Sequence, residues 1–383
     1  MITRREFLVT STVITASQLL SSCSNPTETL NVTMLQGSIP TQLVGAFRQT
    51  LPRNNLIKFK PEAQLQRIFD LLENWQKGEI PRSWGLAQVK NLWNSSSTQA
   101  DLVTLGDSWL ENAIAQKLIQ PLDLDLSKLS GWNNLHPRFQ KLVTKDGTIY
   151  AAPYRWGNTV IAYRKDKSEI PEIKDWSDLW REEFKERISL LDNYREIIGL
   201  TLKKLGYSYN SSDLTKISDL ESELKALHQQ VKFYSSNKYL QPLVLGDTWA
   251  AVGWSSDILP LVRRYPKKIG VVVPASGTSL WADLWVQPTI TDSISDRVKS
   301  RLESWIDFCW QNSGAETIML FTNGISPILN QENQAELTKE LKNNQDFIDF
   351  SLESFSNSEF ILPLAREIDQ EYQSLWKKIR TSS

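Results

Sequence analysis

The chain has few of the side chains that build metal centres or catalytic nucleophile–base pairs. Among its 383 residues are two cysteines, Cys23 and Cys309, and two histidines, His136 and His228. A disulfide framework or a structural zinc site needs more of these residues at close spacing, so the sequence excludes both. The chain also lacks a GxSxG corner, a glycine-rich phosphate loop and an Asp/Gly-rich calcium loop. We therefore expect no cofactor, no metal ion and no enzymatic activity.

An excess of charge of either sign is also missing. The chain has 43 basic and 44 acidic residues, for a net charge of −1, and no block of like charges. This balance indicates neither nucleic-acid binding nor a charged interaction tail. The hydrophobic fraction of 40% and charged fraction of 23% are globular values. At a prior of ~150 residues per domain, the length suits two domains.

The N-terminal segment, MITRREFLVTSTVITASQLLSSC, has the features of an export signal. Paired Arg4 and Arg5 precede a modestly apolar run that is too short to span a bilayer core of ~30 Å. The start resembles a twin-arginine signal, and LSSC at the end resembles a lipoprotein signal. We predict that residues 1–22 are removed, that Cys23 is acylated and that residues 23–29 form a tether. The alternative is an ordinary N-terminal helix with a buried cysteine.

Strand-like and helix-like segments alternate through the next part of the chain. LNVTML, LIKFKP and ADLVTLG have the pattern of strands, and IPTQLVGAFRQTLP and AQLQRIFDLLENWQKG have that of helices. The segment DSWLENAIAQKLIQPLD predicts a further helix, with Asp107 as its N-cap and an end near Pro121. This order predicts a parallel α/β sheet, in which ligands lie beyond the C-terminal ends of the strands.

The second half of the chain predicts two more strand-to-helix transitions. One has Asp192 or Asn193 as the helix cap, and the other lies near Trp254. Two β-type runs are expected in GTIYAAPYRWGNTVIAYRKD, and a hairpin in IGVVVPASGTSLWADLWVQP. The remainder is predicted to be largely helical, from RVKSRLESWIDFCWQ to LAREIDQEYQSLWKKIR. Cys309 lies in the apolar context WIDFCW and is expected to be a buried core residue.

Tryptophan is abundant, with 15 residues, and the segment SLWADLW places two of them around a carboxylate. In a strand, alternation puts Trp281, Asp283 and Trp285 on one face and apolar residues on the other. Aromatic faces attract cations by roughly 0.5–2 kcal/mol, and a carboxylate adds a charge-assisted hydrogen bond of ~1.5–3 kcal/mol. This face therefore suits an organic cation. The alternative is that both tryptophans pack an inter-lobe core while Asp283 caps a loop.

Other candidates lie at element ends, where α/β proteins form ligand sites. Trp254 ends a strand, and Glu196 lies one turn into the helix that follows Asp192 and Asn193. The two histidines stand in contexts typical of surface residues. Glu196, Asp257 and Asp283 also leave open an acid/base pair of the glycosidase type, since spacing alone does not refute it.

Five segments, in order, resemble the bacterial spermidine/putrescine-binding proteins, the extracytoplasmic receptors of polyamine ABC importers. They are ADLVTLGDSWLENAIAQKLIQPLD, GTIYAAPYRWGNTVIAYRKD, LLDNYREIIGLTLKKLGYSYN, VGWSSDI and SLWADLWVQP. The resemblance implies a two-lobe α/β fold of the periplasmic-binding-protein type II. In it, mixed sheets are flanked by helices and a ligand cleft lies between the lobes. We expect residues 30–157 plus 283–330 to form the first lobe and residues 158–282 plus 331–383 the second.

The resemblance also implies ligand-binding roles for individual residues. Trp254, Trp281 and Asp283 match family positions that stack on or pair with the polyamine, and Glu196 matches a carboxylate that meets an amine. A neighbouring family carboxylate is Asn193 here. The predicted ligand-binding residues are Trp254, Trp281, Asp283, Glu196, Asn193, Asp192, Trp285, Ser108 and Trp109.

The first lobe departs from the family pattern at the expected site. Family aromatics are absent from LQGSIP, and a Ser/Tyr pair is replaced by Gly106 and Ser108, with Trp109 adjacent. A family Gln that contacts the ligand falls at about Ile361. The second-lobe wall is therefore retained better than the first-lobe wall.

These features together predict an exported, lipid-anchored solute-binding receptor outside the cytoplasm. Its expected partners are a polyamine or similar organic cation, an ABC permease with its ATPase, and the membrane through the lipid on Cys23. One alternative is the same fold with a non-polyamine solute, and another is a lipoprotein without a transported ligand.

Overall fold

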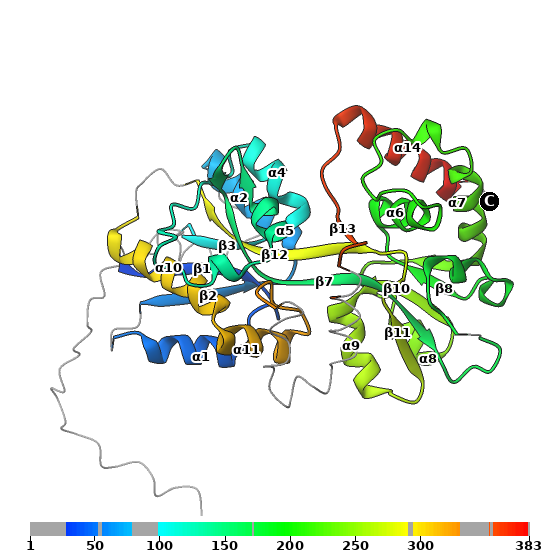
Figure 1. Ribbon diagram of the computed structural model, residues 1–383, viewed down its shortest axis with the longest axis horizontal. Helices are drawn as coiled ribbons and strands as arrows, with labels where there is room; N and C mark the ends of the chain where they lie inside the picture. The colour runs from blue at the N-terminus through cyan, green and yellow to red at the C-terminus, as the bar shows by residue number, and fades with distance from the viewer. Residues whose placement is uncertain are drawn as a thin grey trace, which may run out of the picture.

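The computed structural model describes residues 28–52, 56–78, 99–170, 172–289, 294–329, 352 and 355–381. The predicted export signal and Cys23 lie outside the described residues. Figure 1 shows two lobes side by side, joined by two long strands that run from one to the other, β7 (Ala151–Arg164) and β12 (Ser279–Pro288).

The first lobe is built mainly from the N-terminal third of the chain and from two helices that follow β12. Its opening elements are β1 (Leu30–Leu35), α1 (Thr41–Thr50), β2 (Ile57–Glu62), α2 (Leu65–Lys77), β3 (Leu102–Gly106) and α4 (Asp107–Ala115). It continues with β4 (Ile119–Gln120), α5 (Pro137–Val143), β5 (Thr144–Lys145), β6 (Thr148–Ile149), α10 (Asp296–Trp310) and α11 (Asn312–Thr322).

The second lobe comprises the segment between β7 and β12 together with the C-terminal helix. Its first elements are β8 (Ile188–Leu190), α6 (Tyr194–Lys204), α7 (Leu220–Gln230), β9 (Val231–Tyr234) and α8 (Gln241–Leu245). The later ones are β10 (Ala250–Trp254), α9 (Ser255–Arg264), β11 (Ile269–Val272) and α14 (Arg366–Thr381), and short 3-10 turns lie at Trp176–Trp180 and Glu182–Phe184.

The strand order is β2-β1-β3-β12-β7-β10-β8-β9. β1 pairs in parallel with β2 and β3, as the sequence predicts for this part of the chain, whereas β12 runs antiparallel to both β3 and β7. β10 pairs in parallel with β8 and antiparallel to β7. The predicted fold class, two α/β lobes with mixed sheets flanked by helices, is confirmed.

Two local predictions are wrong. The predicted hairpin does not form, because β11 and β12 each pair with β7 rather than with one another. β7 is 14 residues long, so it offers β12 its first part and β11 its last part. The helix expected from Asp107 to near Pro121 ends at Ala115, and Ile119–Gln120 instead pairs with β12.

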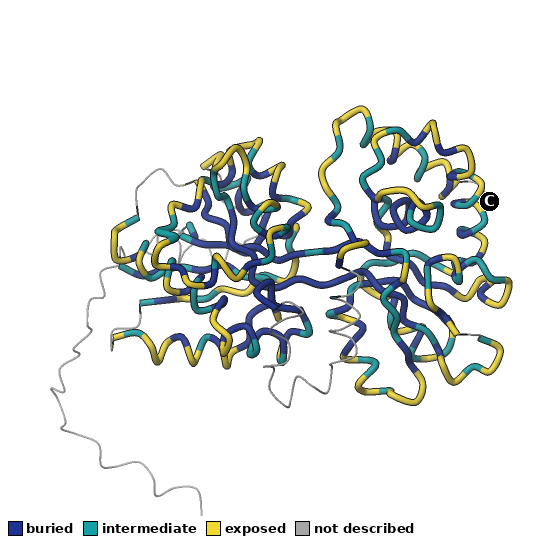
Figure 2. The backbone as a smooth tube through the Cα atoms, viewed as in Figure 1, coloured by how far each residue is buried: buried dark blue, intermediate teal, exposed yellow. Residues whose placement is uncertain are grey.

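The core follows this division into lobes (Figure 2). One buried cluster joins β1 and α1 to α10 and α11, and includes Cys309, which is fully buried as predicted. A second packs β8 and β10 against α6, α7 and α14. A third follows β7 and β12 between them. The apolar face predicted for β12 is confirmed, because Leu280, Ala282 and Leu284 are all buried.

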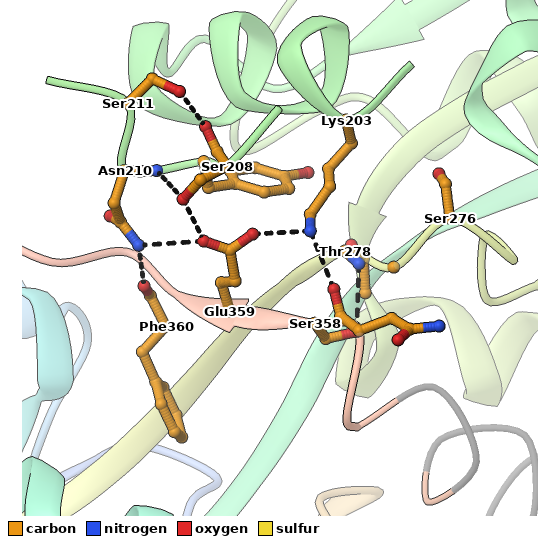
Figure 3. Close-up of polar contacts among 12 residues, drawn as sticks. Lys203, Ser208, Asn210, Ser211, Ser276, Thr278, Ser358, Glu359 and Phe360 are labelled. Carbon is orange, nitrogen blue, oxygen red and sulfur yellow. Dashed lines mark hydrogen bonds and ion pairs between the residues drawn. The ribbon is translucent and has the colours of Figure 1, made fainter. Parts of the chain in front are cut away.

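A third connection between the lobes is the C-terminal segment that contains β13 (Glu359–Phe360). β13 pairs with the start of β12, and Arg138 of α5 donates from Nη2 to the Ser358 carbonyl at 2.6 Å. On the second-lobe side, Lys203 Nζ lies 2.6 Å from Glu359 Oε1, and Asn210 Nδ2 donates to the Phe360 carbonyl at 2.9 Å (Figure 3). The segment is therefore held by polar contacts to both lobes.

Candidate functional site

The predicted site residues of β12 share one face with side chains of β7. Asp283 lies opposite Arg155, and Trp281 lies opposite Gly157. The register shifts between Asp283 and Leu284, where one extra residue, Tyr154, enters β7 next to Pro153. Proline donates no ladder hydrogen bond, so a bulge is a favourable place for it. Directly paired residues point to the same side of a sheet, and this pairing brings Arg155 beside Asp283.

Arg155 and Asp283 form a buried ion pair. Arg155 Nε lies 2.5 Å from Asp283 Oδ2, and the two side chains are 9% and 4% exposed. Burial opposes the charge of Arg155, but Asp283, Tyr154 and Asp257 outweigh it and raise the pKa of the guanidinium. The Arg155 Cζ atom lies 5.5 Å from the centroid of the Trp281 ring, within cation–π range. Asp283, which is predicted to bind an amine, is thus already paired with a cation of the protein, the Arg155 guanidinium.

Two further carboxylates surround this pair. Asp107, the first residue of α4, accepts from the backbone N–H of Ala282 at 3.0 Å, and burial followed by the charge of Asp283 raises its pKa to about 7, against the effect of that hydrogen bond. Asp257 on α9 accepts from the Tyr239 hydroxyl at 2.9 Å, and burial raises its pKa as well. The first lobe thus contributes one carboxylate and the second lobe another.

Asp107 corrects a detail of the sequence analysis. Gly106 occupies the N-cap position of α4, and Asp107 is the first residue of the helix. The Asp107 carboxylate accepts a hydrogen bond from the Ala282 N–H of β12.

Trp281 and Trp254 are the partly exposed aromatics of the site. The Trp281 ring lies against Gly157, where a Cβ atom would come within 2.4 Å of the indole, so only glycine leaves room for it. Its Nε1 donates to the Asn158 carbonyl at 3.3 Å. Trp254 ends β10 as predicted and meets the Tyr239 ring edge-on, with centroids 6.4 Å apart.

Glu196 lies in the first turn of α6 and is buried. Its two carboxylate oxygens accept hydrogen bonds from Thr159 Oγ1 at 3.0 Å and Ser279 Oγ at 2.7 Å. Burial raises its pKa, and these two bonds act in the opposite direction. Of the two predicted caps, Asp192 and Asn193, it is Asn193 that forms the N-cap of α6, and its Oδ1 accepts from the N–H groups of Arg195 and Glu196. The side-chain oxygen of Asn193 is therefore engaged in capping α6.

The other predicted ligand-binding residues lie apart from this group. Trp285 is fully buried in the first-lobe core, stacked on Tyr154 at 4.5 Å. Asp192 is exposed and pairs with Arg380. Ser108 is exposed on α4, and Trp109 packs on Phe69 at 4.6 Å. The ligand-binding role of these four stays a prediction, and we leave them out of the site that we propose.

The two histidines are half-buried and have partners, which differs from the surface positions expected of them. His136 Nδ1 accepts from the Arg138 N–H at 3.2 Å and caps α5. A ring nitrogen of His228 lies 2.9 Å from the Tyr234 hydroxyl. Burial lowers the pKa of both imidazoles.

The sequence analysis missed Arg155 and did not place Asp107 in the site. Arg155 is preceded by Pro153-Tyr154, and only the pairing of β7 with β12 reveals that it faces Asp283. A proline within a strand often marks a bulge, so Pro153 is the feature of the sequence that indicates a change of register between β7 and β12.

Within the described ranges, no three or more side chains of His, Cys, Asp and Glu are grouped so as to hold a metal ion. None of the helices in those ranges is long and apolar enough to span a membrane.

The fold and the grouped carboxylates and indoles define a two-lobed binding protein. The chain belongs to the family of bacterial extracellular solute-binding proteins, whose model matches residues 97–355. This membership confirms the resemblance found in the sequence, and the family is one of binding proteins and not of enzymes.

Curated relatives include polyamine-binding proteins. The chain is 31% identical over 183 residues to the spermidine/putrescine-binding periplasmic protein of Escherichia coli, covering 48% of this chain and 52% of that protein. It is 29% identical over 208 residues to a putrescine-binding periplasmic protein of the same organism, covering 50% and 56%. These alignments thus span about half the length of the relatives.

The fold is shared over nearly the whole chain. The crystal structure of a spermidine/putrescine ABC transporter substrate-binding protein from Streptococcus pneumoniae superimposes with a TM-score of 0.75 at 20% identity. The match covers 92% of this chain and 98% of that structure. At this identity the likeness establishes the two-lobe fold.

Proposed function

We propose that this protein is the receptor of an ABC importer and captures a small organic amine, such as a polyamine, between its two lobes. The observation that carries the proposal is an imbalance of charge beside Trp281. Asp257 and Asp283 both interact with the charge of Arg155, and Asp107 lies close enough to Asp283 for the two carboxylates to repel each other. A bound ammonium would offset the negative charge that remains when all three carboxylates ionise. The relatives that bind spermidine and putrescine support the same ligand class.

Capture would proceed by closure of the lobes. β7 and β12 supply one face that carries Arg155, Asp283 and Trp281, whereas Glu196 and Trp254 come from the second lobe. A ligand that touches both lobes binds the closed state more tightly than the open one, and that difference in affinity shifts the population. The closed form would then dock on the permease.

Glu196 is the proposed acceptor for the ammonium. A carboxylate has about four lone-pair sites, and two hydroxyl donors leave part of that capacity unused. An ammonium beside it would favour the ionised form and so lower the pKa that burial has raised.

We further propose that the receptor is exported and anchored outside the cytoplasm through a lipid on Cys23. The support is the order of the two signals, paired Arg4 and Arg5 followed by LSSC. A Cys23→Ser variant is expected to move from the membrane fraction to the soluble fraction of cells. If both forms fractionate with the membrane, the lipid anchor is refuted.

Thermal unfolding with added amines tests the proposed ligand class. The full chain carrying Cys23→Ser would be titrated with putrescine, spermidine and 4-aminobutanoate, and with glucose and succinate as controls that carry no amine. A ligand at ~100 times its Kd stabilises the folded state by about 2.7 kcal/mol, which is an upward shift of several degrees. A shift with one or more amines and none with the controls supports the proposal. If no amine raises the unfolding temperature, the proposed ligand class is wrong, although the fold is unaffected by that result.

A further inference from the structure

Asp283 lies between Arg155 on one neighbouring strand and the end of β3 on the other. In β12 it pairs with Arg155 of β7 and with Gly106, the last residue of β3. Arg155 Nε lies 2.5 Å from Asp283 Oδ2, and both side chains are buried. Because opposite charges offset each other, a carboxylate that already holds a guanidinium attracts an ammonium less strongly. Asp283 is therefore a poorer acceptor for a ligand cation than the sequence alone indicates.

Asp107, which directly follows β3, has no such cation. It begins α4 at the C-terminal end of a strand, where α/β folds form ligand sites. None of the described residues forms an ion pair with it. A carboxylate has about four lone-pair sites, more than the backbone N–H groups of Ala282, Ser108 and Asp107 itself use. β3 and β7 lie on opposite sides of β12, about 10 Å apart at ~4.8 Å per strand, so Arg155 reaches Asp283 more readily than Asp107.

The charges around Asp107 also differ from those around Asp257. Burial raises the pKa of Asp107 to about 7, and the charge of Asp283, which has the same sign, adds to that effect. Burial also raises the pKa of Asp257, but there the Tyr239 hydroxyl and the charge of Arg155 act in the opposite direction. A cation beside Asp107 would relieve its repulsion with Asp283 and favour its ionised form.

β12 relates Asp107 to Glu196, the acceptor proposed for the ammonium. Ala282, whose N–H binds Asp107, is three residues after Ser279, whose hydroxyl binds Glu196. That spacing along the strand is about 10 Å at ~3.3 Å per residue. Trp281 lies between the two positions on the strand, and its ring is partly exposed. A ligand with one ammonium at Glu196 can therefore pass the indole and bring a second positive charge to Asp107.

We propose that Asp107, and not Asp283, accepts the cation at the first-lobe end of the ligand. This inference rests on the proposed function, which assigns one ammonium to Glu196 and leaves the other end of the ligand open. Asp283 then acts mainly to hold Arg155 beside Trp281, where the guanidinium carbon lies 5.5 Å from the ring centroid. The residue that the resemblance matches to an amine acceptor and the residue that accepts the amine are thus different.

Ligand pairs that differ by one ammonium test this assignment. Affinities of the full chain carrying Cys23→Ser would be measured by calorimetry at about pH 8, where Asp107 is ionised, for diaminoalkanes and 1-aminoalkanes with four to eight carbons. We expect the best diaminoalkane to bind at least tenfold more tightly than the aminoalkane of equal length. Asp107→Asn should bring the two affinities to within threefold, because the amide keeps an acceptor for the Ala282 N–H but carries no charge.

Glu111 of the same helix provides the matched control. It lies one turn after Asp107 on α4 and is exposed. Glu111→Gln removes the same charge and should keep the affinity ratio of the parent, and circular dichroism would establish that each variant is folded. If Asp107→Asn fails to fold, Asp107→Ser decides the question through the same ratio, since serine also suits the start of a helix.

A double variant decides between the two carboxylates. Arg155→Gln combined with Asp283→Asn removes the buried ion pair without a change in net charge. It should weaken the binding of both ligands, because Arg155 lies beside Trp281, but the diaminoalkane should still bind at least tenfold more tightly. Loss of the ratio in this variant would assign the ammonium to Asp283 and overturn the inference.

The outcomes separate the inference from the proposed function. Aminoalkanes that bind the parent as tightly as diaminoalkanes rule out an acceptor for a second ammonium and leave the amine receptor standing. A preference for diaminoalkanes that survives Asp107→Asn overturns the assignment in the same way. If the parent binds neither series, the proposed function is wrong and the inference fails with it.

Discussion

Trp281 and Trp285 have the same sequence context and the same strand face, yet they occupy different environments. Trp281 is partly exposed beside Arg155, and Trp285 is fully buried on Tyr154. The bulge at Tyr154 lies between their pairing partners, since Trp281 pairs with Gly157 and Trp285 pairs with Ala152. The alternation of side chains along a strand predicts only that both tryptophans lie on the same face, and it does not distinguish their environments.

Substitution of Trp281 should therefore affect ligand binding, whereas substitution of Trp285 should affect the stability of the fold. Trp281→Ala is expected to weaken amine binding by ~0.5–2 kcal/mol, because a cation–π surface is lost. Trp285→Ala should lower the free energy of unfolding by ~3–5 kcal/mol through the cavity that it leaves. Calorimetric titration and urea denaturation of both variants check these values. Amine affinity unchanged in Trp281→Ala would contradict the role given to that ring.

At the scale of elements, β13 and the residues around it hold the C-terminal segment to the second lobe. Glu359 accepts from Ser208 and pairs with Lys203, whose Nζ also donates to the Asn357 carbonyl at 2.9 Å (Figure 3). Beyond β13, α14 packs on α6 and α7, with Tyr372 fully buried. Docking of α14 and pairing of β13 are thus linked through one short segment.

Acid should weaken this attachment. Burial alone would raise the pKa of Glu359, but the hydrogen bonds from Lys203 and Ser208 outweigh it and hold the pKa below its ordinary value. A carboxylate with a depressed folded pKa stabilises the native state above its unfolded pKa of ~4.3, and this contribution is lost as pH falls through the folded pKa. Glu359→Gln should cost about 0.5–1 kcal/mol at pH 7, discounted for partial exposure.

Hydrogen exchange of α14 at pH 7 and at about pH 3.5 measures the effect. Glu359→Gln should exchange faster than the parent at pH 7, and the difference should narrow in acid. Glu371→Gln, on the exposed side of α14, is the control and should match the parent. Equal protection of Glu359→Gln and the parent at pH 7 would refute the link.

At the scale of the whole molecule, the grouped carboxylates couple stability and binding to pH. Asp107 has a folded pKa of about 7, raised by burial and by Asp283, against a reference value of 3.8. Between these two values the folded state holds a proton that the unfolded state has released. Stability without ligand should therefore fall as pH rises from about 4 to about 7, at up to ~1.4 kcal/mol per pH unit from this group.

A cationic ligand should reverse part of this effect. An ammonium near Asp107 favours its ionised form, so binding at about pH 6 should release protons. Calorimetry in two buffers of different ionisation enthalpy measures the number released. Asp107→Asn should release fewer protons and flatten the pH dependence of unfolding. Binding enthalpies that do not depend on the buffer would contradict this coupling.

Much of the fold follows from local sequence patterns. The strands before α1 and α2, the transitions into α6 and α9, and the buried face of β12 were all predicted, since each depends on periodicity, caps or chain order. The sequence narrows the cap of α6 to Asp192 or Asn193, because a capping side chain lies within three residues of its targets, and the structure shows Asn193. The bounds predicted for the lobes stay a prediction.

The sequence by itself determined that this is a two-lobed solute-binding protein with aromatic and acidic residues at its element ends, because hydrophobic spacing and ordered motifs are properties of the chain. Only the tertiary structure decided which of those residues meet. The pairing of Arg155 with Asp283, the turn of Asp107 towards β12 and the burial of Trp285 all depend on the register between segments about 130–175 residues apart. A one-residue bulge shifts the register between β7 and β12, and no local pattern specifies which side chain lies across from another strand.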